Sequence, residues 1–445
     1  MDQIIIPSQT LPVIGKTDIC VIGGSCSGVF AAVRAARLGA KVTIMEKQNR
    51  FGGVAVSSLV SIWHSLLDTD YRRTVIAGLT QEAIDRLQRR SAVKIVPENP
   101  SAGSILNTEE LSIELDRMVV EAGITPMLHT VFSQPYFRDG HLAGVIVENK
   151  SGRGVILADY FIDASGDGDL CHRAGFSTWR NDGLQPPTTC ARFSGWKLPE
   201  NFDLGVAIRA HAGEYGLPDG FIWGAEVPGS DIFMLAGTRV LNCDCANAPD
   251  LTAAEIEGRR QVRAIMDILR EHHGIASPVL QTLPSMIGIR ETRHIASAHR
   301  LTGKELLAGT GFDDAIAYGT YRVDIHQHDR GGVLFRYLDG TEVFASPGHP
   351  HETGRWRDPV ADEPKYYQIP LRSLIPTGSA NVIAAGRMID ADAEAFGAVR
   401  VMVNLNQTGE AAGVTAMLAL NSGGSVAAVP AAKVRAVLNS GGSCL

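Results

Sequence analysis

Long apolar runs and basic blocks are both missing from this chain of 445 residues. No run of about 18 uninterrupted apolar residues is present, so we expect no membrane-spanning helix. The first residues lack a basic start followed by a long apolar stretch, so we expect no secretory signal. The formal net charge is −7, and no block rich in lysine or arginine offers the basic stripe typical of nucleic-acid-binding proteins. Membrane and nucleic acid are therefore disfavoured as partners.

Cysteine is sparse, because the chain has only seven, an odd number with scattered spacing. In a chain of this length, that pattern predicts reduced thiols in a cytoplasmic protein rather than a disulfide scaffold. Cys243 and Cys245 form one Cys-x-Cys pair, which could bind a metal or take part in redox chemistry. One pair without a second is a weak signal, so we interpret these residues as ordinary thiols and predict no metal site.

Glycine, in contrast, is abundant and clustered, with 47 residues. Clustered glycines indicate tight backbone turns, which can bring the main chain close to a ligand. Hydrophobic residues make up 45% of the chain and charged residues 20%, so a globular fold with ample core is expected. At about 150 residues per domain, the length is sufficient for two or three domains.

The first glycine cluster lies inside a strand–helix–strand pattern. Residues 18–22 are a short apolar, β-rich run that predicts a buried parallel strand. Residues 23–28 (Gly-Gly-Ser-Cys-Ser-Gly) follow directly, and residues 29–38 form an alanine-rich predicted helix. A second predicted strand, residues 41–45, leads into Glu46, which lies 18 residues beyond the last glycine of the cluster. The helix N-terminus can bind a pyrophosphate, and an acid at this spacing can accept ribose hydroxyl groups.

One position departs from the usual dinucleotide fingerprint. Ser25 stands where G-x-G-x-x-G has its second glycine, and its β-carbon would keep a phosphate slightly further from the backbone. Serine is small and can donate a hydrogen bond, so we still predict a dinucleotide site. Gly52 and Gly53, shortly after Glu46, predict a second close backbone approach that suits a longer ligand.

The rest of the chain supplies further strands and helices. Residues 108–123 predict an amphipathic helix, and turns at Asp139-Gly140 and Ser151-Gly152 predict an antiparallel three-stranded meander. Three more elements are expected further along the chain. Two are buried strands, at residues 160–163 and 381–385, and the third is a long helix at residues 401–420.

Together these residues resemble the FAD-dependent oxidoreductases that have a glutathione-reductase-type FAD domain, on the fumarate-reductase-like branch. The matching motifs occur in the right order over nearly the whole chain: residues 23–28, 46–47, 51–53, 162–170, 288–293, 369–374, 384–387 and 400–413. They are specific for the family and not for a substrate.

The resemblance implies an α/β fold. It consists of a Rossmann-like FAD-binding domain, with a parallel sheet plus an antiparallel β-meander, and an inserted α+β substrate domain. The implied FAD-binding domain covers residues 1–195 and 369–445, and the implied substrate domain covers residues 196–368.

The resemblance also implies which residues contact non-covalent FAD. The implied contacts are Gly23, Gly24, Ser25, Cys26, Ser27 and Gly28 at the pyrophosphate, Glu46 at the adenosine ribose, Val131 at adenine, Lys47, Gly52, Gly53, Ala164, Gly166, Gly386 and Arg387 along the cofactor, and Arg400, Val401 and Met402 at the flavin. Related enzymes often carry an acid where this chain has Arg387. His64 lies in a region where some flavoenzymes attach FAD covalently, but the local sequence does not match that motif.

Two further absences narrow the chemistry. No Cys-x-x-Cys or Cys-x-x-x-x-Cys follows Gly53, which excludes a disulfide reductase that works through such a pair. No second strand-plus-glycine unit for NAD(P)H stands out in the middle of the chain, so direct reduction by a nicotinamide is less favoured.

Alternation across residues 321–328 marks one candidate catalytic face. The pattern predicts a strand with Arg322, Asp324, His326 and His328 on the same side. Such a face could bind a carboxylate or hydroxyl group and move a proton. A solvated strand face or a structural salt-bridge set is the alternative interpretation.

Arginines complete the set of catalytic candidates, which are Arg400, His326 and Arg290. On the fumarate-reductase-like branch, an arginine matching Arg400 binds a substrate carboxylate, although the glycine pair that usually follows it is absent here. An arginine that braces the start of the helix is the alternative. The family motif also places Arg290 and Arg293 near the flavin, unless Glu291 pairs with one of them and makes the set structural.

The leading functional hypothesis is an enzyme that transfers a hydride between FAD and a small polar substrate, with a carboxylated substrate as one option. Electrons would pass to oxygen or to a redox partner. An enzymatic alternative is a reductase or monooxygenase whose flavin is reduced by NAD(P)H. An alternative of another class is a flavin-binding electron-transfer subunit, although the clustered cysteines of iron–sulfur centres are absent. The sequence does not predict an oligomeric state.

Overall fold

The computed structural model describes residues 4, 7–218, 220–327, 331–346 and 349–445. A seven-stranded mixed sheet combines strands from residues 13–163 with one strand from residues 382–384. Its order is β6 (Thr125–Met127), β2 (Val42–Met45), β1 (Val13–Ile22), β9 (Gly152–Asp163), β8 (His141–Asn149) and β7 (Val131–Arg138), with β22 (Val382–Ala384) also paired to β9. β6, β2, β1, β9 and β22 pair in parallel, whereas β7, β8 and β9 form an antiparallel meander. The expected combination of parallel sheet and meander is confirmed.

β9 is long enough to pair with different neighbours along its length. Residues 152–157 pair with β8, and residues 161–163 pair with β22. The strand predicted at residues 160–163 is therefore only the last part of a strand of 12 residues. This arrangement brings the carboxyl ends of β1, β9 and β22 to one edge of the sheet.

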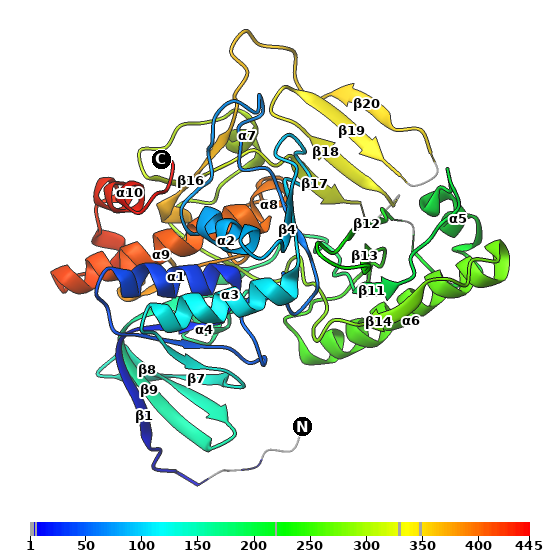
Figure 1. The fold of residues 1–445 in the computed structure, drawn as a ribbon. Coiled ribbons are helices and arrows are strands. Elements are labelled where there is room, and N and C mark those ends of the chain that lie inside the picture. Colours follow the sequence, from blue (N-terminus) through cyan, green and yellow to red (C-terminus); the bar gives the residue numbers. More distant parts are fainter. Residues whose placement is uncertain (1–3, 5–6, 219, 328–330, 347–348) are drawn as a thin grey trace.

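Helices α1 (Cys26–Arg37), α9 (Met402–Ser422) and α3 (Thr108–Glu121) pack together over this sheet (Figure 1). Two glycines of α9 allow a very close crossing with α1. A β-carbon on Gly409 would lie 2.2 Å from the carbonyl oxygen of Ser27, and one on Gly413 would lie 2.2 Å from that of Ala31. Only glycine fits at such a distance, so these two positions fix how near α9 lies to α1.

A buried ion pair joins the same two helices. Arg34 of α1 donates to the carboxylate of Glu410 of α9, which also accepts from the backbone N–H of Leu79 at 2.9 Å. Leu79 begins α2 (Leu79–Gln88), so the carboxylate binds a helix N-terminus as well as the arginine. Burial raises the pKa of Glu410, and Arg34 opposes this rise.

The central part of the chain forms two four-stranded antiparallel sheets, seen to the right and at the top of Figure 1, besides shorter two-stranded ones. One has the order β12 (Trp223–Glu226), β13 (Phe233–Ala236), β11 (Cys190–Ser194) and β14 (Val279–Thr282). Its apolar face packs on α5 (Leu204–His211) and α6 (Ala248–His273) through a shared hydrophobic cluster. The other sheet consists of β17 (Val323–His326), β18 (Val333–Arg336), β19 (Thr341–Ala345) and β20 (Glu352–Arg355).

Shorter elements connect these layers. They are β3 (Ile62–Trp63), β4 (Val93–Ile95), β5 (Ser104–Leu106), α4 (Asp169–Arg173), β10 (Thr178–Trp179), β15 (His294–Ile295), α7 (Gly303–Leu307), β16 (Ala315–Gly319), β21 (Tyr367–Pro370), α8 (Ala393–Val399), α10 (Ala431–Ser440) and the 3-10 helices Leu371–Ser373 and Val426–Ala428.

Two element boundaries differ from those expected from the sequence. α1 begins at Cys26 rather than at residue 29, because the Ser25 hydroxyl accepts from the Gly28 N–H at 3.3 Å and caps the helix three residues earlier. The strand expected across residues 321–328 is shorter, since β17 covers only Val323–His326. His328 lies outside the described residues.

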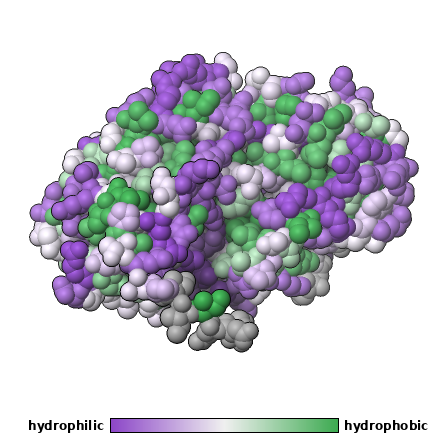
Figure 2. Space-filling view, turned by 90° about the horizontal axis from the view of Figure 1, so that it is seen from below, coloured by the Kyte–Doolittle hydropathy of each residue, from purple (hydrophilic) through white to green (hydrophobic). Residues whose placement is uncertain are grey.

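The described helices include none that is long and apolar enough to cross a lipid bilayer. On the face shown in Figure 2, apolar residues are scattered among polar and charged ones.

Candidate functional site

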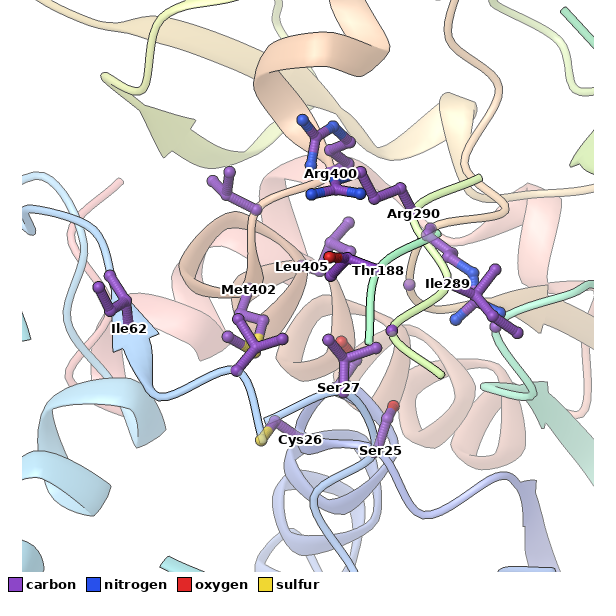
Figure 3. Close-up of a pocket in the computed structure, with 18 of the residues that line it drawn as sticks. Ser25, Cys26, Ser27, Ile62, Thr188, Ile289, Arg290, Arg400, Met402 and Leu405 are labelled. Carbon is purple, nitrogen blue, oxygen red and sulfur yellow. The ribbon is translucent and has the colours of Figure 1, made fainter. Parts of the chain in front are cut away.

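A cavity of about 480 Å³ opens at the edge of the sheet where β1, β9 and β22 end. Ser25, Ala164 and Gly386, which closely follow these three strands, line its wall. Ligands of open α/β sheets bind in the crevice outside the carboxyl ends of the strands, so the cavity lies where a ligand is expected. Figure 3 shows Ser25, Cys26 and Ser27 on one side and Arg290 and Arg400 on the opposite side.

The turn from β1 into α1 is built from glycines that leave no room for a side chain. Gly23 has a φ of +105°, and a β-carbon there would lie 2.3 Å from the Ala164 carbonyl oxygen. A β-carbon on Gly28 would lie 2.1 Å from the Gly23 carbonyl oxygen. These glycines therefore shape the turn, and the cavity wall itself is formed by the residues between them.

Ser25 fits at the second fingerprint position because Gly53 faces it. A β-carbon on Gly53 would lie 2.8 Å from the β-carbon of Ser25. Because Gly53 has no side chain, the loop at Gly53 leaves space for the side chain of Ser25. The Cys26 thiol donates to the Gly52 carbonyl oxygen at 3.5 Å and joins the two loops. The departure from G-x-G-x-x-G is thus matched by the second glycine pair.

The cavity end near α1 suits a diphosphate and a ribose. The first N–H groups of α1 have no partner inside the helix, and no acidic residue stands in its first turn. Glu46 lines the cavity and is 8% exposed. Its carboxylate accepts from the backbone N–H groups of Gly24 at 2.7 Å and Gln48 at 2.9 Å, which fixes the orientation of the carboxylate toward the cavity edge.

Arg387 lies against the loop that follows β9. It pairs with Asp167, which also accepts from the Thr292 hydroxyl at 2.8 Å. Gly166 has a φ of +83°, and a β-carbon there would lie 2.3 Å from an Arg387 nitrogen. Arg387 therefore fits here because Asp167 neutralises its charge and Gly166 leaves space for its side chain.

Most of the expected cofactor residues meet at this cavity. Those that line it are Ser25, Cys26, Ser27, Glu46, Lys47, Gly52, Gly53, Ala164, Gly166, Gly386, Arg387, Arg400, Val401 and Met402. Gly23, Gly24 and Gly28 lie in the turn behind the wall. Val131 is 50% exposed at the start of β7 and does not line the cavity, so its contact with adenine stays a prediction.

The other end of the cavity concentrates positive charge. Arg239, Arg290, Arg322 and Arg400 all line it. Within the part of the chain that the structure describes, neither Arg239 nor Arg290 has a carboxylate partner; Arg290 donates to the Pro186 carbonyl oxygen. Burial, together with the charge of a neighbouring arginine, lowers the pKa of Arg239 to about 9 and that of Arg290 to about 10.

Asp324 offsets part of this charge. Its carboxylate lies 3.3 Å from Arg400 and accepts from the Tyr321 hydroxyl at 2.7 Å. Burial raises the pKa of Asp324, but Arg400, the Tyr321 hydroxyl and Arg322 lower it more, so that its pKa lies below the usual value. His326 also lines the cavity, and its Nδ1 accepts from Arg239 at 3.2 Å. The alternation across residues 321–328 thus identified three side chains that do meet at one cavity.

His64 lines the same end of the cavity. Its Nδ1 is buried without a hydrogen-bond partner among the described residues, and its ring centroid lies 4.0 Å from that of Tyr321. Burial first, and then the charges of Arg322 and Arg400, lower the pKa of His64 to about 3, so the ring is neutral. The structure therefore places an uncharged imidazole among the arginines.

The family motif around Arg290 divides into two parts. Arg290 faces the cavity, whereas Arg293 donates to Asp169 at 3.0 Å and does not line the cavity. Glu291 does not pair with either arginine, as one interpretation of the sequence had expected, and instead contacts His294 at 2.9 Å. Arg293 therefore stands outside the cavity, and the expectation that it lies near the flavin receives no support from this geometry.

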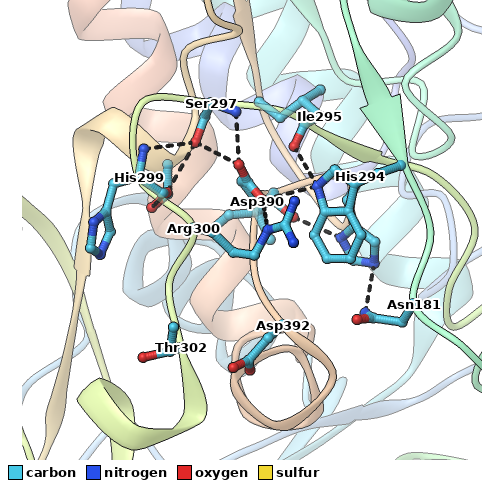
Figure 4. Close-up of polar contacts among 12 residues, drawn as sticks. Asn181, His294, Ile295, Ser297, His299, Arg300, Thr302, Asp390 and Asp392 are labelled. Atoms are coloured by element: carbon cyan, nitrogen blue, oxygen red, sulfur yellow. Dashed lines mark hydrogen bonds and ion pairs between the residues drawn. The ribbon is translucent and has the colours of Figure 1, made fainter.

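His294 and Asp390 form a polar network behind the cavity (Figure 4). His294 is fully buried, and its Nδ1 lies 2.8 Å from the Ile389 carbonyl oxygen. Asp390 accepts from the Ser297 N–H at 2.7 Å and from Arg300 at 2.9 Å. The network ties the segment after Arg290 to the segment after β22 and so fixes two walls of the cavity relative to each other.

Arg239 is one residue of this site that no sequence pattern indicated. It follows β13, lies outside every recognised motif, and reaches the cavity only because the sheet of β11–β14 folds over it. Tyr321 belongs to the alternating segment but falls out of phase with the predicted face, so it was also missed.

The strand–glycine turn–helix unit, the oriented Glu46 and the long cavity along the sheet edge define a dinucleotide-binding flavoprotein. The glycine turn and the α1 N-terminus fit the diphosphate of FAD, and Glu46 fits its ribose. The chain belongs to the FAD-dependent oxidoreductase family, whose family model matches residues 18–438.

Two curated relatives match part of the chain. Digeranylgeranylglycerophospholipid reductase 2 of Methanothermobacter thermautotrophicus is 27% identical over 221 residues, which are 47% of this chain and 53% of that protein. Thiamine thiazole synthase of Methanococcus aeolicus is 24% identical over 159 residues, which are 34% of this chain and 55% of that protein. The chain thus spans about half the length of the curated relatives it matches.

Among solved structures, a geranylgeranyl bacteriochlorophyll reductase-like protein of Thermoplasma acidophilum aligns with a TM-score of 0.47 at 13% identity. That alignment covers 96% of this chain and 82% of the other.

Proposed function

We propose that this enzyme catalyses hydride transfer between a small anionic organic substrate and non-covalent FAD. The observation that supports this function best is the charge at one end of the cavity, where Arg239, Arg290, Arg322 and Arg400 meet with Asp324 as their carboxylate neighbour. Desolvated cations are costly unless a counter-ion is present. An excess of three positive charges favours a substrate with two or more negative charges, such as a dicarboxylate.

We propose that FAD lies along the cavity from the α1 N-terminus toward these arginines. Residues 23–28 would hold the diphosphate and Glu46 the ribose, with Gly386, Arg387 and the start of α9 along the remaining length. When bound, FAD supplies the two-electron redox chemistry. In this proposal residues 1–195 and 369–445 form the FAD-binding domain and residues 196–368 the substrate domain.

The arginines would take different roles in binding. Arg290 is half-buried and has no carboxylate partner among the described residues, so its guanidinium is available to a substrate anion. Arg400 is held in place by Asp324 and would bind a second anionic group. His326 would act through Arg239, because its Nδ1 accepts from that arginine and orients it.

His64 is the residue that we assign to proton transfer. Arg322 and Arg400 contribute to its low pKa, so a bound anion that offsets their charge would raise that pKa. The imidazole would then accept a proton from a substrate hydroxyl or amino group only in the complex. Asp324 is already engaged by Arg400 and Tyr321, which makes it a poorer acceptor.

An anaerobic absorption experiment tests the proposed function. FAD-loaded protein is mixed with a panel of hydroxy- and amino-acids that carry one, two or three carboxylates, and with their amides. We expect loss of the oxidised flavin band with a carboxylate of at least two charges and none with its amide. H64Q should bind the same anion but reduce the flavin more slowly, by about 10²-fold or more.

The same assay separates the alternatives. Rapid bleaching by NADH or NADPH, with no response to any carboxylate, would favour a reductase or monooxygenase and contradict the proposal. A flavin that responds to neither, but exchanges electrons with a protein partner, would favour an electron-transfer subunit.

We further propose a cytoplasmic location, which the seven free cysteines support.

A further inference from the structure

Two histidines and a glutamate converge at the junction of α5 and α6, on the right of Figure 1. His211 ends α5, Glu214 lies in the turn that follows, and His272 lies in the last turn of α6. His211 Nδ1 lies 3.1 Å and His272 Nε2 lies 3.7 Å from the two oxygens of Glu214. One potential ligand atom from each residue lies within 4.8 Å of the others.

The donor set matches a borderline divalent cation. Imidazole nitrogen and carboxylate oxygen bind Zn²⁺ at about 2.0–2.2 Å, and three such ligands leave a fourth position open for water. Tyr215 Oη lies 3.1 Å from His272 Nε2 and donates to Glu271 at 2.7 Å, so a metal at this nitrogen would displace the tyrosine hydroxyl, which keeps Glu271 as its acceptor. The C-terminal end of a helix of 26 residues adds negative potential at the same place.

Existing contacts already hold the three side chains together. The rings of His211 and His272 stack with centroids 3.6 Å apart, and both side chains are about one quarter exposed, at 25% and 26%. A metal would require both rings to turn out of the stack and point their nitrogens at a common centre.

We propose that His211, Glu214 and His272 bind one zinc-class divalent cation that braces α5 against the end of α6. None of the three lines the cavity, so this site is separate from the proposed redox site. Phe221, in the segment after α5, and Trp223, the first residue of β12, both line the cavity. A brace at the start of this segment would stabilise that wall without touching the cofactor.

Zinc binding to the full-length, untagged, FAD-loaded protein tests this inference. After removal of metals with a chelator, equilibrium dialysis against Zn²⁺ should give one bound ion per chain. H211A and H272A should each weaken binding more than about tenfold, and E214Q should weaken it less. H141A is the matched control, because His141 is an exposed histidine on β8, and it should bind as the wild type does.

Thermal unfolding gives an independent readout. Zn²⁺ should raise the midpoint in the wild type and in H141A but not in H211A, because a ligand that binds only the folded state stabilises it. Far-UV circular dichroism and flavin content confirm that each variant is folded. No bound zinc, or zinc affinities of H211A and H272A equal to that of the wild type, would overturn the inference. Neither result depends on the substrate proposed above.

Discussion

At the residue scale, Glu46 is the position on which FAD affinity should depend most clearly. Its carboxylate is held at the cavity edge by the N–H groups of Gly24 and Gln48, which leaves lone pairs for ribose hydroxyls. A hydrogen bond to a charged group contributes about 1.5–3 kcal/mol, so E46A should weaken FAD binding about 10- to 100-fold. Titration of the apoprotein by flavin fluorescence measures the change. A folded E46A with unaltered affinity would remove Glu46 from the cofactor site.

Glu291 should make stability depend on pH. Burial raises its pKa, but His294, Asn181 and the Gln185 N–H lower it more, so the pKa lies below 4.5. A depressed folded-state pKa stabilises the protein above the unfolded-state pKa, and this contribution is lost as pH falls through the folded-state value. E291Q should cost about 3 kcal/mol at about pH 7, with a gap to wild type that narrows below about pH 4.5.

Urea unfolding at several pH values measures that gap. The exposed pair of Glu148 and Arg153 provides the control, since E148Q should change little at any pH. If the difference in the free energy of unfolding between the wild type and E291Q stayed constant down to the lowest pH measured, the carboxylate of Glu291 would not be ionised in the folded protein.

Single residues of the site were predictable where they belong to a pattern along the chain. The alternating segment contains Asp324 and His326, and family motifs contain Arg290 and Arg400; all four line one cavity. Arg239 could not be found in this way, because its place in the cavity depends on how distant sheets pack. Proximity of that kind is a property of the fold and leaves no local signal.

At the element scale, the crossing of α1 and α9 links stability to cofactor binding. A β-carbon at Gly409 or Gly413 would collide with an α1 carbonyl at 2.2 Å, so G409A and G413A should each destabilise the protein by about 1–3 kcal/mol. Gly409 packs against the backbone of Ser27, which lines the cavity. Gly413 packs against the backbone of Ala31, which lies one helical turn further from the cavity.

G409A should therefore weaken FAD binding more than G413A does at equal loss of stability. Denaturant unfolding of the apoproteins and FAD titration of both variants provide the comparison. Equal FAD affinities in the two variants would show that the crossing positions the helices but not the cofactor loop.

Elements of the main sheet were predictable because each is a β-rich apolar run or ends in a glycine turn. The strand at residues 18–22, the meander turns and the helix at residues 401–420 all appear, with boundaries that shift by capping and pairing. Apart from β17, which the alternation across residues 321–328 indicated, the strands of the sheets β11–β14 and β17–β20 were not predicted. Their strands have only four or five residues each, too few for a periodic pattern to emerge.

At the scale of the whole molecule, charge is distributed unevenly. The chain carries a formal net charge of −7, yet four arginines line one end of its cavity. A cleft of one charge sign with low-dielectric walls focuses the local potential, so small anions should enter it despite the acidic exterior. This contrast is the feature from which we infer the substrate class.

The most direct test is a titration of the FAD-loaded protein with succinate and with its uncharged diamide, followed by the flavin difference spectrum. Our proposal predicts that succinate perturbs the spectrum and saturates, that the diamide does not, and that R290M weakens succinate binding at least about tenfold. R138M, which changes an exposed arginine on β7, should bind as the wild type does. Equal responses to succinate and the diamide, or an R290M variant with wild-type affinity, would contradict an anionic substrate at this cavity.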